Sequence, residues 1–150
     1  MGFNPSRFNS SNFNSSSSDE KIAYALLRIV AGINLLMHGV SRLLAGPAGF
    51  AGHLSEQFAR SPLPAPLVHV FGSVLPMAEG LIGLLLLIGL KTRWALIAAS
   101  LLMMVLTFGS SLIQDWAAAG TQLVYALVFS VLLFMRRYNA WSLDGCANRA

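Results

Sequence analysis

Four long apolar stretches limit what this chain can fold into. Crossing the hydrocarbon core of a bilayer takes about 20 apolar residues in a helix, and lipid leaves every backbone group to be satisfied within the segment. Only 11% of the 150 residues are charged, whereas 55% are hydrophobic. We therefore predict an all-α, four-helix transmembrane bundle, with spans at about Ile22 to Leu44, Leu67 to Leu90, Trp94 to Ile113 and Ala117 to Phe134.

The segments outside the spans suggest one membrane domain with two tails. Residues 1–20 are rich in Ser and Asn and offer too little apolar surface to fold, so we expect a disordered tail. Residues 21–137 form the four-span domain, and residues 138–150 form a polar C-terminal tail. The loop between the first two spans is broken by Gly and Pro, but Phe50 to Arg60 fits a short amphipathic helix.

The basic residues outside the membrane divide unequally between its two sides. One side carries only Arg42 and Arg60, whereas the other carries seven: Arg7, Lys21, Lys91, Arg93, Arg136, Arg137 and Arg149. Because Lys and Arg favour the cytoplasmic side, we expect both termini in the cytoplasm and a multi-pass protein of the cell inner (plasma) membrane. The net charge of +4 is spread over span ends, so we expect contact with the lipid bilayer and no nucleic acid partner.

Glu79 is a carboxylate in the middle of the second span. An ionised side chain near the bilayer centre costs at least about 2.5–3.5 kcal/mol, so it normally marks a pair, a cavity or a site. We expect its partner to be Arg28 on the first span, with Asn34 at the same depth. A purely structural Arg28–Glu79 pair that sets helix register is the alternative.

Polar residues share one face of the first span. Asn34, His38 and Arg42 follow one another at four-residue spacing, and Arg28 falls within the same arc of about 120°. Tyr125 lies in the outer half of the fourth span. Because lipid offers no partners for such groups, we expect these faces to meet inside the bundle.

The second span has a matching face of polar and small residues. His69, Gly72, Pro76, Glu79 and Gly83 align at helical spacing, and the glycines allow another helix to approach closely. We therefore predict an inner layer of Arg28, Asn34 and Glu79 and an outer layer of His38, Arg42 and His69.

Two segments resemble the DoxX family of membrane proteins. In "LLRIVAGINLLMHGVSRLL" the resemblance lies in an early Arg, a His-Gly pair and a following basic residue, here Arg28, His38-Gly39 and Arg42. In "AEGLIGLLLLIGLKTRWAL" it lies in Glu79 and the Gly, Leu and Thr-Arg pattern that follows. The resemblance covers about Lys21 to Arg137.

The DoxX resemblance implies a four-helix membrane bundle that acts as an oxidoreductase subunit in quinone-linked oxidation of thiosulfate or thiols. Under the hypothesis of a redox subunit, His38 and Glu79 are the catalytic groups, with His38 at a quinone carbonyl and Glu79 in proton transfer. The expected ligand-binding residues are Arg28, Asn34, Arg42, His69 and Tyr125.

The residues also leave other roles open. The chain shows no flavin, haem or metal motif, and its single cysteine excludes an internal disulfide. No cofactor is evident in the chain itself, although a quinone is a possible ligand. A partner redox subunit would therefore supply the redox chemistry. A homo-oligomer is the other assembly considered. A non-catalytic accessory or assembly subunit ranks level with the redox subunit, and a small transporter ranks behind both.

Overall fold

The computed structural model describes residues 10–147, and their side chains over residues 18–145. All regular structure in this range is helical. The elements in order are α1 (Ser10–Ala45), α2 (Pro47–Gln57), α3 (Ala65–Ile88), α4 (Thr92–Leu112), α5 (Trp116–Phe134), the 3-10 helix η2 (Arg136–Tyr138) and α6 (Leu143–Ala147). Of these, α1, α3, α4 and α5 are long and apolar enough to cross a membrane, which confirms the predicted four-helix transmembrane bundle.

The first helix begins earlier than predicted. α1 starts at Ser10, so residues 10–20 are helical where a disordered tail was expected. Extending an existing helix avoids the cost of nucleation. The helix of the apolar span can therefore continue into the weak helix formers that precede it. Residues 1–9 of that expected tail lie outside the described part of the chain.

The other helix ends lie within three residues of the predicted ones. α2 starts at Pro47 rather than Phe50, because proline suits the first turn of a helix. α3 ends at Ile88, and the next residue, Gly89, adopts the left-handed conformation (φ 69°) that glycine favours at a helix C-terminus.

α1 and α3 pack antiparallel with their backbones in contact. A Cβ atom added at Gly83 would lie 2.3 Å from the Leu36 nitrogen, and one at Gly39 would lie 2.4 Å from the Gly80 nitrogen. Small residues permit this approach between membrane helices. The predicted close-packing role of Gly83 is therefore confirmed, and the two contacts set the register of α1 against α3.

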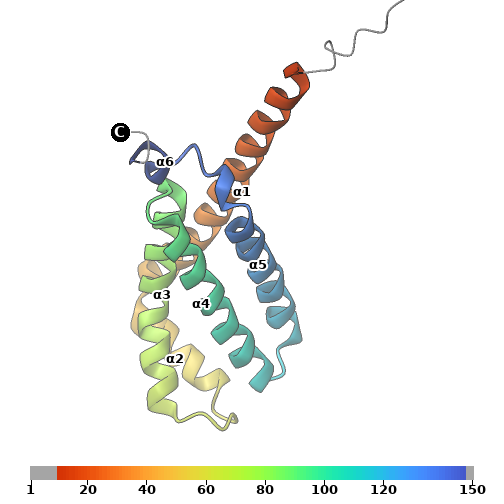
Figure 1. Cartoon of the computed structure of the whole chain (residues 1–150). Coiled ribbons are helices and arrows are strands. Elements are labelled where there is room, and N and C mark those ends of the chain that lie inside the picture. The colour runs from red at the N-terminus through yellow and green to blue at the C-terminus, as the bar shows by residue number, and fades with distance from the viewer. Residues whose placement is uncertain (1–9, 148–150) are drawn as a thin grey trace, which may run out of the picture.

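The bundle is tight at one end and splayed at the other. We call the end with the α3–α4 turn the inner end and the end with α2 the outer end (Figure 1). Toward the inner end the four long helices share an apolar core, formed by Tyr24, Ala31, Leu35, Leu86, Ala95, Leu96, Ala99, Met103, Phe129 and Leu132. Toward the outer end the α1–α3 pair and the α4–α5 pair separate, with α2 lying across α3 (Figure 1).

Both described chain ends lie at the inner end (Figure 1), as an even number of spans requires. This end carries the α3–α4 turn with Lys91, and Arg136 and Arg137 directly after α5. The placement agrees with the charge asymmetry of the sequence. Its assignment to the cytoplasm stays a prediction.

The segment after α5 folds back onto the inner end. The Asp144 carboxylate accepts hydrogen bonds from the backbone N–H groups of Lys91 (2.8 Å) and Thr92 (2.7 Å), at the start of α4. Asn139 donates to the Thr92 hydroxyl (3.0 Å). Partial burial alone would raise the pKa of Asp144, but the hydrogen bonds from Thr92 and Lys91 outweigh it and lower that pKa.

Candidate functional site: a polar cavity within the bundle

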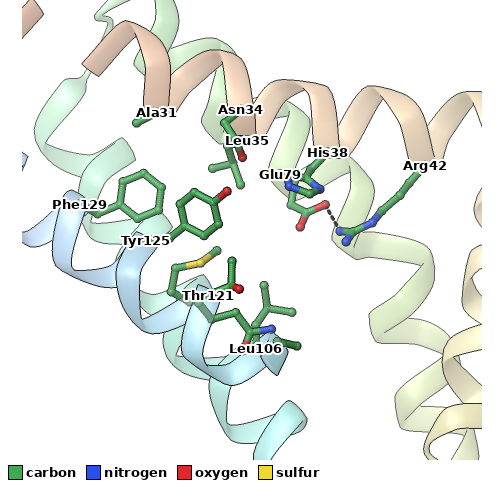
Figure 2. A pocket seen from close by; sticks show the side chains of 13 residues that line it. Ala31, Asn34, Leu35, His38, Arg42, Glu79, Leu106, Thr121, Tyr125 and Phe129 are labelled. Carbon is green, nitrogen blue, oxygen red and sulfur yellow. Dashed lines mark hydrogen bonds and ion pairs between the residues drawn. The ribbon is translucent and has the colours of Figure 1, made fainter. Parts of the chain in front are cut away.

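A cavity of about 230 Å³ lies between the four long helices at the level of Glu79. We call it the polar cavity. Its walls combine apolar side chains with polar ones from three helices. The polar members are Asn34, His38 and Arg42 from α1, Glu79 from α3, and Thr121, Gln122 and Tyr125 from α5. The predicted convergence of polar helix faces is therefore present, and most of it lies in this cavity (Figure 2).

An ion pair between Arg42 and Glu79 forms one wall of the polar cavity (Figure 2). The Glu79 side chain is only 4% exposed and that of Arg42 is 28% exposed. The Arg42 guanidinium also lies over the Phe50 ring of α2, 4.6 Å from its centroid, a favourable cation–π geometry. The buried carboxylate is thus paired, and its partner connects the cavity to α2.

The predicted pairing of Glu79 with Arg28 is wrong. Arg28 is buried at the inner end, where it donates to the backbone carbonyls of α3 at Leu86 and Leu87 (3.1 Å to Leu87). It also donates to the carbonyl of Trp141 (2.7 Å). Arg28 therefore stabilises the C-terminal end of α3, where cations are favoured, and holds the returning segment in place.

The register of α1 against α3 explains why Arg28 cannot reach Glu79. Because Gly39 faces Gly80, Glu79 is level with residues near 40 of α1. Arg28 lies about 18 Å from that level along the helix, at 1.5 Å per residue. The sequence gives a residue's position only within its own span, and it does not report the register of α1 against α3.

Three polar side chains of the cavity wall make no hydrogen bond within the described part of the chain. They are Asn34, His38 and Tyr125, and in Figure 2 the Tyr125 hydroxyl is directed toward α1. By contrast, Thr121 donates to the Ala117 carbonyl of its own helix (3.1 Å). Asn34 and His38 are exposed and Tyr125 is half-buried, and hydrocarbon offers such groups no hydrogen-bond partner. The free groups therefore call for water or a ligand.

His69 does not join the predicted outer layer. Its side chain is exposed on the first turns of α3, and it lines neither cavity of the bundle. Its neighbour Val68 takes the buried position. The predicted catalytic roles of His38 and Glu79, and the ligand-binding roles of Arg28, Asn34, Arg42, His69 and Tyr125, stay predictions.

A second cavity of about 400 Å³ lies at the outer end. We call it the apolar cavity. Phe50 and Leu54 of α2 and Phe58 after it line one side, and side chains of α3 and α4 line the other. The sequence analysis missed this cavity, although the four-residue spacing of these three side chains was the signal for it.

Among the described side chains, no three of His, Cys, Asp or Glu come together in a way that would hold a metal ion. The polar groups of the site are suited to hydrogen bonding with a neutral ligand and to charge pairing at Arg42 and Glu79.

The family model described as methylamine utilisation protein MauE matches residues 20–123. This match overturns the interpretation of the two segments as a DoxX resemblance, and with it the functions carried over from that family. No curated protein and no solved structure matches the chain.

Proposed function

This chain belongs to the MauE family, and from that premise we propose that it is a membrane accessory protein of a redox-linked, multi-protein system for methylamine utilisation. The chain is a multi-pass membrane protein with four candidate spans. In the proposed role it assists partner proteins and is not itself the oxidising enzyme. It acts through the polar cavity, which opens in the outer half of the bundle.

The observation that carries the proposal is the set of unpaired polar groups around a buried ion pair. A purely structural Arg42–Glu79 pair would be enclosed by packed side chains. Here it lines a cavity into which Asn34, His38 and Tyr125 also present groups without partners. Such a combination of a concave site with a few converging polar groups is typical of ligand binding.

Growth on methylamine tests the proposal in the organism that encodes the chain. We expect deletion of the gene to impair growth when methylamine is supplied as the nutrient, and the wild-type gene to restore it. The variant His38→Gln should restore growth poorly, because it removes the imidazole from the cavity wall. Membrane levels of each variant, measured by immunoblot, separate lost function from lost protein.

The matched control is His69→Gln, which makes the same chemical change at an exposed position that lines neither cavity. It should restore growth like wild type. Normal growth of the deletion strain on methylamine would overturn the proposed role. Equal growth of the two histidine variants would show that the polar cavity takes no part in the proposed role.

A further inference from the structure

The polar cavity and the apolar cavity are neighbours that share part of their walls. Arg42, Leu106, Ala118 and Gln122 line both of them. One ligand can therefore contact both cavities at once. Polar side chains make up a larger share of the first wall than of the second, and this difference restricts what such a ligand can be.

The polar cavity is balanced in charge. Its guanidinium, on Arg42, is paired with its carboxylate, on Glu79. The groups left free for a ligand are the amide of Asn34, the imidazole of His38 and the hydroxyl of Tyr125, which can donate and accept hydrogen bonds. A group that carried net charge would leave a charge unpaired in the membrane interior, which is costly. The cavity is therefore suited to an uncharged, hydrogen-bonding head group.

The apolar cavity is suited to a hydrocarbon chain or ring system. Most of its lining is apolar, as at Phe71 and Leu75, although Gln57, Ser110 and Asp115 also line it. Its rim between α3 and α4 includes Leu67, Val105 and Phe108, which are 56%, 50% and 61% exposed. These rim residues lie on spans that face lipid. A tail in this cavity can thus remain continuous with the bilayer.

We propose that the crevice formed by the two cavities binds a neutral, single-tailed amphiphile that reaches it from the bilayer. The head hydrogen-bonds to the free groups of the polar cavity, and the tail lies in the apolar cavity and leaves between α3 and α4. A phospholipid is disfavoured, because its charged head would have to lie near the bilayer centre. This inference rests on the site named in the proposed function and specifies its ligand.

Two sources offer this chemistry: a lipid-soluble electron carrier, such as an alkyl quinone, and a neutral lipid. Decylbenzoquinone and monodecanoylglycerol are suitable probes, because both carry a neutral head and one ten-carbon chain. Each is added to the purified full-length protein in nanodiscs, and the melting temperature is followed against probe concentration. Binding to the native state raises the melting temperature in a saturable manner.

Ala118→Phe is the decisive variant, because Ala118 lies in the wall where the two cavities meet. The bulky ring should separate the compartments and weaken probe binding at least about tenfold, which corresponds to 1.4 kcal/mol. The matched control is Ala117→Phe, which adds the same ring at the adjacent exposed position outside both cavities. It should bind like wild type.

Tyr125→Phe keeps the proposal testable if Ala118→Phe does not fold. It removes one free hydroxyl without adding volume, and should weaken binding about 2- to 10-fold, as expected for one hydrogen bond. Saturation by the quinone alone would identify an electron carrier, whereas saturation by the glyceride would identify a lipid. Either result supports the amphiphile site.

The proposal is overturned if neither probe gives a saturable shift with wild type, or if Tyr125→Phe and a folded Ala118→Phe both bind like wild type. These outcomes do not depend on growth. If the chain supports growth on methylamine but binds neither probe, the accessory role stands and the amphiphile proposal is wrong. If the chain binds a probe but is dispensable for growth on methylamine, the amphiphile proposal stands and the accessory role is wrong.

Discussion

At the residue scale, Arg42 and Glu79 place two opposite charges in the interior of a membrane bundle, and each makes the other tolerable. The Glu79 side chain is almost fully buried and has Arg42 as its ion-pair partner. Removing one member of a buried pair leaves an uncompensated charge, whereas replacing both with apolar residues removes the problem. The pair should therefore behave as a unit.

We predict that Arg42→Leu or Glu79→Leu alone destabilises the protein by about 3–5 kcal/mol, and that the double change recovers part of the loss. Thermal unfolding of the four proteins in one detergent measures this coupling. The same cycle with Arg28→Leu and Glu79→Leu should be additive within about 0.3–0.5 kcal/mol, because the two groups do not meet. Coupling of Glu79 to Arg28 instead of Arg42 would contradict the observed geometry.

Asp144 predicts a pH dependence outside the membrane-spanning helices. Hydrogen bonds from Thr92 and Lys91 lower its pKa in the folded state. A carboxyl whose pKa is lowered by folding contributes stability above its unfolded pKa, about 3.9, and loses that contribution as the pH falls below it. Wild type should thus melt above Asp144→Asn at pH 5–7, and the gap should shrink as the pH falls below about 4.

The control for Asp144→Asn is Glu56→Gln. Glu56 is an exposed residue of α2 whose side chain makes no hydrogen bond or ion pair among the described residues. This variant should melt like wild type over the same pH range. A gap between wild type and Asp144→Asn that stays constant down to pH 3 would show that the carboxylate does not hold the returning segment.

At the element scale, the contact between α1 and α3 depends on which glycines face the partner helix. A Cβ at Gly83 would meet the backbone of Leu36, whereas a Cβ at Gly80 would meet nothing within 4 Å. The two glycines are three residues apart on one helix. They therefore form a matched pair for testing close backbone packing.

We predict that Gly83→Ala costs about 1–3 kcal/mol or more, because the two backbones must move apart. Gly80→Ala should be neutral or stabilise the helix by up to about 1 kcal/mol. Melting temperatures in one detergent compare the two directly. Equal losses for both variants would mean that the helices do not pack in the observed register.

At the scale of the whole molecule, the paired helices give a bundle that is closed at the inner end and splayed at the outer end (Figure 1). The charge asymmetry predicts that the splayed end faces away from the cytoplasm. Reporter fusions after Ala59 and after Ala118 should therefore score outside, and a fusion after Lys91 should score inside. A cytoplasmic score at Ala59 would place the opening of the crevice on the other side of the membrane.

Apolar run length alone determined the four spans and their approximate ends, because a bilayer imposes a minimum length on any helix that crosses it. Helical spacing also brought Asn34, His38 and Arg42 to one face. These features depend on residues close together in the sequence. Because they do not depend on the family assignment, these predictions hold although the DoxX resemblance was wrong. The functional interpretation, in contrast, relied on that resemblance.

Only the tertiary structure decided which charges meet. The partner of Glu79 depends on the register of α1 against α3, which is set by Gly39 and Gly83 through backbone contacts far apart in sequence. The offset between α1 and α3 along their axes decides whether Arg28 or Arg42 reaches Glu79. No spacing rule within one helix predicts this offset. The apolar cavity and the Asp144 contact likewise arise where distant segments meet, because packing between elements, unlike helix formation, is not a local property of the chain.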